Sequence, residues 1–139
     1  MTTCTKSSDH KQQCAPCHSL DQSSLLSTEQ MAEELKNLPL WAQQQHGIFK
    51  ISRKFTAKNF QAALDCINQV GVIAEREGHH PDLHLTSYRD VEIVLFTHKL
   101  GGVTLNDFAI ARVIDLEVKI SYSPKWLREN PEADSTALK

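Results

Sequence analysis

The feature that most constrains this fold is a long helical pattern over residues 57–77, with Thr56 as its expected N-cap. The apolar stripe expected to face the protein's own sheet is Phe60, Leu64, Ile67, Gly71 and Ala74. A second apolar band lies beside it: Ala62, Ala63, Cys66, Val70 and Ile73. A small domain can hardly cover a helix that is apolar on two sides. We therefore expect the chain to form a homodimer or homotetramer.

Two pairs of strand-like segments flank this long helix. The four expected strands cover residues 40–45, 48–55, 83–88 and 91–97. The first pair is joined by a two-residue turn at His46-Gly47 and the second by a turn at Arg89-Asp90. Apolar side chains concentrate on one side of the second strand, as is typical of a sheet that is covered on one face.

Two shorter helices complete the pattern. Ser27 and Gln30 form an expected capping box at the start of the first helix, which ends before Pro39. Thr104 opens the last helix, and Asp107 lies in its first turn, where a negative charge suits the helix dipole. The element order is therefore α-β-β-α-β-β-α. It predicts an α+β fold, with a four-stranded antiparallel sheet and three helices on one face.

Length and charge narrow the possible classes of protein. The 139 residues suit one domain, expected over residues 25–124, with a flexible N-terminal arm (1–24) and a C-terminal tail (125–139). A net charge of -2, from 15 basic and 17 acidic residues, excludes a strongly basic nucleic-acid binder. Apolar runs stay below the ~20 residues of a membrane span, and the N-terminus lacks the apolar stretch of a secretory signal. We expect a cytoplasmic protein, with the nucleus as the alternative location.

A cysteine pair lies in the N-terminal arm. Cys14, Cys17 and His18 match the C-x-x-C-H pattern of covalent haem attachment, but nothing else in the chain resembles a cytochrome. Zinc binding by this pair, with His18 or His10 and with Cys4, is a second alternative. We favour a free thiol pair, because the surrounding polar segment shows no apolar periodicity.

Histidines concentrate after the long helix. His79 and His80 stand where this helix stops, between Gly78 and Pro81, and His98 lies at the exit of the last strand. The rigid turn is expected to project both imidazoles without burying either in the core. In an antiparallel sheet the chain enters its third strand beside the place where it leaves its fourth. The topology therefore predicts three imidazoles from two regions of the chain at one rim of the sheet.

Three imidazoles at one rim suit two kinds of chemistry. Imidazole titrates near neutral pH, so one ring can accept a proton while another donates one. Three neutral imidazoles can instead bind zinc or iron, although the H-E-x-x-H spacing of hydrolytic zinc sites is absent. His84 lies inside an expected strand and outside this pattern, so we interpret it as an ordinary polar residue.

The spacing of these residues resembles a family signature. The string Glu75-x3-His79-His80-Pro81-x6-Tyr88-x9-His98-x8-Asp107 fills every fixed position and every gap of the pterin-4a-carbinolamine dehydratase signature. The similarity extends to Trp41, Thr97-His98 and Gly101-Gly102, and it covers roughly residues 25–124.

The resemblance implies a dehydratase of tetrahydrobiopterin recycling. Such an enzyme removes water from the 4a-hydroxytetrahydrobiopterin that leaves an aromatic amino acid hydroxylase, and it forms quinonoid dihydropterin. The elimination needs a general acid and a general base but no metal and no other cofactor. The resemblance also implies an alternative, a non-enzymatic dimerisation cofactor and transcriptional coactivator. An assembly scaffold with the same fold is a further alternative.

The resemblance also implies the roles of individual residues. His79 and His98 would act as general acid and base, in an order that the spacing leaves open, and His80 would hold the pterin and its 4a-hydroxyl. Asp107 would orient a histidine or bind the pterin edge. The remaining residues expected at the substrate are Glu75 and Thr97 as hydrogen-bonding groups, Trp41 as a wall of the site or a core residue, and Pro81 as a rigid support.

Overall fold

The structure of the protein is a computed structural model that describes residues 21–44 and 47–133. The cysteine motif at Cys14 and Cys17 and the expected turn residue His46 lie outside the described residues. The strands are β1 (Trp41–Gln44), β2 (Lys50–Thr56), β3 (Asp82–Thr86) and β4 (Asp90–Leu95). The helices are η2 (Gln22–Ser24, a 3-10 turn), α1 (Thr28–Leu35), α2 (Phe60–Glu77), α3 (Leu105–Glu117) and α4 (Pro124–Glu129).

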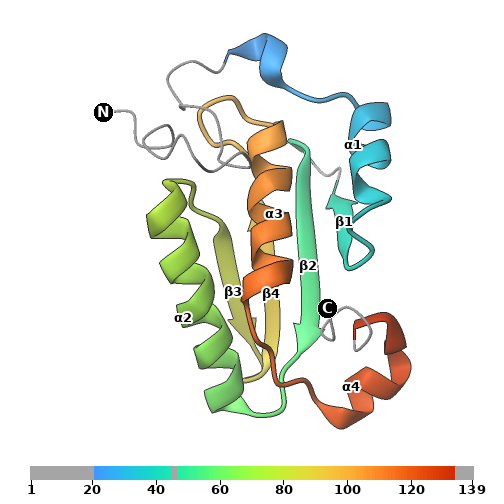
Figure 1. The fold of residues 1–139 in the computed structure, drawn as a ribbon, viewed down its shortest axis with the longest axis vertical. Helices are drawn as coiled ribbons and strands as arrows, with labels where there is room; N and C mark the ends of the chain where they lie inside the picture. Colours follow the sequence, from blue (N-terminus) through green and yellow to red (C-terminus); the bar gives the residue numbers. More distant parts are fainter. Residues whose placement is uncertain (1–20, 45–46, 134–139) are drawn as a thin grey trace.

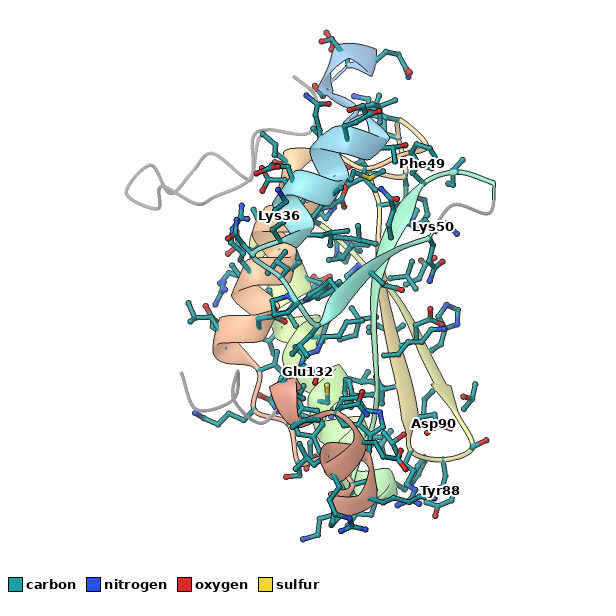
Figure 2. The ribbon with its side chains drawn as sticks, turned by 90° about the vertical axis from the view of Figure 1, so that its right-hand side faces the viewer. Lys36, Phe49, Lys50, Tyr88, Asp90 and Glu132 are labelled. Carbon is teal, nitrogen blue, oxygen red and sulfur yellow. The ribbon has the colours of Figure 1, made fainter. Side chains whose placement is uncertain are left out.

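The four strands form one antiparallel sheet in the order β1-β2-β4-β3. Helices α2 and α3 lie side by side against this sheet (Figure 1), and the view at right angles places the helices on one of its sides (Figure 2). The predicted α+β fold with an antiparallel sheet is confirmed. Each expected strand is present, with bounds that differ by at most two residues.

Side-chain caps fix where the helices begin. Ser27 and Gln30 form the expected capping box of α1, and Thr104 and Asp107 form a second one at α3. The expected cap Thr56 of the long helix is wrong. Helix α2 begins after Asn59, whose side chain accepts the Ala62 amide at 2.8 Å, whereas Thr56 is the last residue of β2.

The turn between β3 and β4 also differs from the prediction. Its centre is Ser87-Tyr88, where φ is 47° and 55°, and the predicted pair Arg89-Asp90 is wrong because Asp90 already belongs to β4. Consecutive positive φ values are normally signalled by glycine or asparagine. Neither residue type is present here, so the sequence pointed to the wrong pair.

Helix α2 buries mainly its second apolar band, whereas Ala74 is the one buried residue of the stripe expected to face the sheet. The buried side of this helix is Ala63, Cys66, Val70, Ile73, Ala74 and Glu77. Phe60 is 50% exposed, and Leu64 and Ile67 are half-buried. Helical spacing identifies both bands but not the rotation of the helix about its axis.

Burial raises the pKa of the Cys66 thiol to about 11, so this side chain packs as an apolar group.

A largely buried ion pair connects the sheet to helix α3. Arg53, 4% exposed, donates from Nη1 to Asp115 Oδ1 at 2.6 Å and from Nη2 to the Tyr122 hydroxyl. The indole of Trp41 donates to the same Asp115 oxygen at 2.9 Å. Burial raises the pKa of Asp115, and the neighbouring Arg53 opposes that shift. This network joins β1, β2 and α3 to the segment before α4.

Part of the expected C-terminal tail is folded. Helix α4 has Ser123 as its N-cap and Pro124 in its first turn. Its Trp126 stacks on Tyr122 with ring centroids 5.1 Å apart. The Trp126 ring also makes a T-shaped contact with Phe55, with ring centroids 6.4 Å apart. The Ser-Pro start and the aromatic pair four residues apart were sequence signals for this element.

Among the described helices, none has both the length and the apolar character needed to cross a membrane.

Candidate active site

Helix α2 ends in a turn that directs His79 inward. Gly78 adopts the left-handed conformation (φ 68°), and the amides of Gly78 and His79 both donate to Ala74 O, at 2.9 and 3.2 Å. His79 is consequently 6% exposed, and its Nε2 lies 2.5 Å from Asp107 Oδ1. The expectation that both neighbouring imidazoles project from the core is therefore wrong for His79.

Asp107 is fully buried and surrounded by donors. Its Oδ2 accepts the Thr97 hydroxyl and the Thr104 amide, each at 2.9 Å, and Oδ1 faces His79. It lies in the first turn of α3, where the helix dipole favours negative charge. These contacts hold the Asp107 carboxyl group in one orientation, with Oδ1 facing Nε2 of His79. Because the ring uses Nε2 for this contact, Nδ1 is the nitrogen left for a ligand.

Thr97 completes the buried network. Its hydroxyl donates to Asp107 and lies 2.9 Å from the Thr104 hydroxyl, which in turn accepts the Asn106 amide at 3.2 Å. Thr97 itself is 5% exposed. The structure therefore places this predicted substrate-binding residue behind His79, as a partner of the carboxylate.

His80, the next residue along the chain, points outward. Its side chain is 60% exposed, and Nε2 lies 2.7 Å from Oε2 of Glu75, itself 81% exposed. Five residues separate the two along the chain, so the last turn of α2 and the Gly78 bend bring them together. Half-buried Pro81 follows and leads directly into β3.

His98 lies in a tight loop after β4. Thr97 closes this loop, because its amide donates to Gly102 O at 2.7 Å and its carbonyl accepts the Gly101 amide at 2.9 Å. Gly101 has a φ of 67°, which a larger residue would adopt only with strain. The His98 ring is half exposed, and its Nε2 lies 3.5 Å from Oδ1 of Asp82, the first residue of β3.

The structure joins the predicted residues through two carboxylates. Asp107 contacts both His79 and Thr97, the neighbour of His98, while Asp82 lies two residues after His80 and faces His98. The two histidine regions therefore meet at the end of the sheet where β4 leaves and β3 enters, as the topology predicted. Sequence reasoning missed Asp82, although the expected antiparallel pairing already placed the start of β3 beside the end of β4.

Trp41 and His84 lie outside this cluster. Trp41 is 5% exposed and uses its indole N–H for Asp115, so the structure gives it a place in the core. His84 is exposed on β3. Across residues 21–44 and 47–133, no group of three or more His, Cys, Asp or Glu side chains is arranged to hold a metal ion.

Each of the three imidazoles has a carboxylate neighbour, but in a different environment. The His79–Asp107 pair is buried, whereas the His80–Glu75 and His98–Asp82 pairs are open to solvent. An imidazole ring can both accept and donate a proton. One buried and two open pairs can therefore supply different proton-transfer groups to a molecule bound at this end of the sheet.

Comparison with known proteins points to one family. Residues 24–116 match the family model described as pterin 4 alpha carbinolamine dehydratase. The protein "Pterin-4-alpha-carbinolamine dehydratase 2, mitochondrial" of Arabidopsis thaliana is 36% identical over 121 residues, which cover 85% of this chain and 64% of that protein. The crystal structure of a transcriptional coactivator/pterin dehydratase from Brucella melitensis has a TM-score of 0.60 at 32% identity, covering 66% of this chain and 96% of that one.

Removing the Thr97 hydroxyl should weaken the fold. The isosteric change Thr97→Val leaves a lone pair of the buried Asp107 carboxylate without its donor, so we expect the free energy of unfolding to fall by about 1–3 kcal/mol. Thr86→Val, at an exposed position of β3, is the matched control and should change it by less than about 0.5 kcal/mol. Urea denaturation measures both, and equal effects of the two changes would contradict this description of the network.

Proposed function

Because the chain belongs to the pterin-4-alpha-carbinolamine dehydratase family, we propose that it removes water from a 4a-hydroxytetrahydropterin. The observation that carries this proposal is the set of three imidazole–carboxylate pairs gathered at one end of the sheet. An aromatic amino acid hydroxylase is the class of enzyme that would release this substrate. The product would be a quinonoid dihydropterin, which a reductase can return to the tetrahydro form.

The proposed elimination is a proton-transfer reaction. A general acid protonates the 4a-hydroxyl, the C4a–O bond breaks, and water leaves. A general base takes the proton from N5, and the N5–H electron pair forms the new double bond between N5 and C4a. The substrate loses one water without net oxidation or reduction. Positioned imidazoles typically accelerate such steps by about 10²–10⁴-fold each.

The surroundings of the three rings support a division of roles. In its neutral form, a His79 ring that donates Nε2–H to Asp107 keeps a lone pair on Nδ1, which suits the general base. His98 is open to solvent beside Asp82, so its ring can meet the 4a-hydroxyl as the general acid. His80, held by Glu75 at the exposed rim, is then free to bind the pterin ring and its hydroxyl.

We expect His98→Ala to lower dehydratase kcat by about 10²–10⁴-fold, because it removes a proton donor while leaving the core intact. Stopped-flow turnover of 4a-hydroxytetrahydropterin measures the effect. His84→Ala is the matched control, since it removes an exposed histidine of β3 outside the cluster, and it should keep wild-type turnover. Wild-type turnover in His98→Ala, or an equal loss in both variants, would argue against the assignment.

We also propose that the chain self-associates through the partly exposed side of α2 that carries Phe60, Leu64 and Ile67. Phe60, Leu64 and Ile67 lie along one side of this helix and are incompletely covered by the rest of the chain. The Brucella melitensis relative carries the name of a transcriptional coactivator as well as of a dehydratase, so a transcription factor is the alternative occupant of the same band.

Light scattering tests this assembly. We expect the wild-type chain to measure as a dimer or tetramer and Ile67→Glu to shift it toward the monomer, because a buried charge disfavours an apolar contact. Val72→Glu is the control, because Val72 of α2 is already 67% exposed, and this change should leave the size unchanged. A monomeric wild-type chain would refute the self-association.

A further inference from the structure

We infer that Phe96 is a positioning residue, which holds the His98 imidazole by direct ring contact and is itself held by Lys50. This inference rests on the proposed function and adds to it two residues that hold the general acid in place. It arises from a contrast among the three histidines at the site. His79 and His80 have carboxylate oxygens at 2.5 and 2.7 Å, but the Asp82 oxygen is 3.5 Å from His98.

The Asp82 contact is too weak to fix the His98 ring. A separation of 3.5 Å is longer than a well-formed N–H···O hydrogen bond, and both side chains are about half exposed. Exposed ion pairs of this kind contribute little, because water competes for both partners. The loop hydrogen bonds of Thr97 and Gly101 fix the backbone of His98 but leave its side-chain torsions free.

A contact between two aromatic rings supplies the missing restraint. The Phe96 and His98 ring centroids are 4.1 Å apart with the planes tilted by 46°. The two residues are two positions apart where the chain leaves β4, and this spacing lets both rings lie on the same side of the chain. Phe96 is 8% exposed and belongs to the same cluster of buried apolar residues as Leu95. Its neighbours therefore cover it almost completely.

Lys50 covers Phe96 from the neighbouring strand. Ile51 of β2 pairs with Leu95 of β4, so Lys50 and Phe96 follow at the next position of the ladder. The Lys50 ammonium lies 4.8 Å from the Phe96 ring centroid, within the range of a cation–π contact. Figure 2 labels Lys50 at the end of the sheet opposite to Tyr88 and Asp90, which is the end where the histidines lie. The order Lys50, Phe96, His98, Asp82 thus runs from β2 to the start of β3.

The test compares Phe96→Leu, Phe96→Tyr and Phe55→Leu. The last is a matched control, because Phe55 is a buried phenylalanine of the same sheet that makes T-shaped contacts with Tyr122 and Trp126 at the α4 end. Proton NMR reports the ring contact directly, because the ring current of Phe96 shifts the resonances of the His98 ring protons. Stopped-flow kinetics on 4a-hydroxytetrahydropterin reports its consequence for catalysis.

We expect Phe96→Leu to remove the ring-current shift of His98 and to lower kcat about three- to tenfold, with KM within about twofold, as suits the loss of one aromatic pair. Phe96→Tyr should preserve both the shift and the turnover, and so should Phe55→Leu, despite its cost in stability. Unchanged His98 resonances in Phe96→Leu would overturn the inference, and so would a lost shift with wild-type kcat. A wild-type chain without turnover would contradict the proposed function. The NMR shift needs no substrate, so it tests the contact between Phe96 and His98 separately.

Lys50→Met tests the second part of the inference. This change keeps most of the aliphatic stem and removes the charge above Phe96. We expect the Phe96 ring protons to shift and the His98 shift to decrease by less than in Phe96→Leu. Phe96 resonances identical to those of the wild-type chain would show that Lys50 does not hold this ring.

Discussion

The buried carboxylate of Asp107 determines how the histidine end of the sheet is built. An isolated charge in the core is costly, and here the cost is offset by the His79 ring, the Thr97 hydroxyl, the Thr104 amide and the start of α3. These donors come from the end of α2, the end of β4 and the first turn of α3. A single side chain therefore connects the three elements that carry the site, and it draws His79 out of solvent while His80 stays exposed.

Helix α3 carries a second, partly buried carboxylate two turns further on. Asp115 binds Arg53 and Trp41 in the middle of the sheet, so one face of a single helix supports both the site and the core beside it. This arrangement explains why Trp41, though part of the family resemblance, has its polar contact away from the histidines. The open pairs at His80 and His98 lie on the outer rim, where a flat bicyclic ring can approach them.

The sequence predicted the parts of this molecule that depend on local spacing or on antiparallel pairing. The strands, the Ser27 and Thr104 caps and the meeting of His79 with the His98 loop are of this kind. It did not predict which band of α2 faces the sheet, because spacing does not fix the rotation of a helix. The burial of His79 also depends on a partner 28 residues away, Asp107. The contacts of Phe96 with Lys50 and His98 likewise depend on side-chain directions that only the folded chain specifies.

The protonation state of the His79 ring tests this account most directly. If Asp107 orients the ring as described, the neutral imidazole carries its proton on Nε2 and leaves Nδ1 bare. Nitrogen-15 NMR of the folded protein distinguishes the two ring nitrogens. A protonated, hydrogen-bonded Nε2 with an unprotonated Nδ1 is the expected result, whereas a neutral ring that carries its proton on Nδ1 would contradict the orienting role of Asp107 and the base assigned to His79.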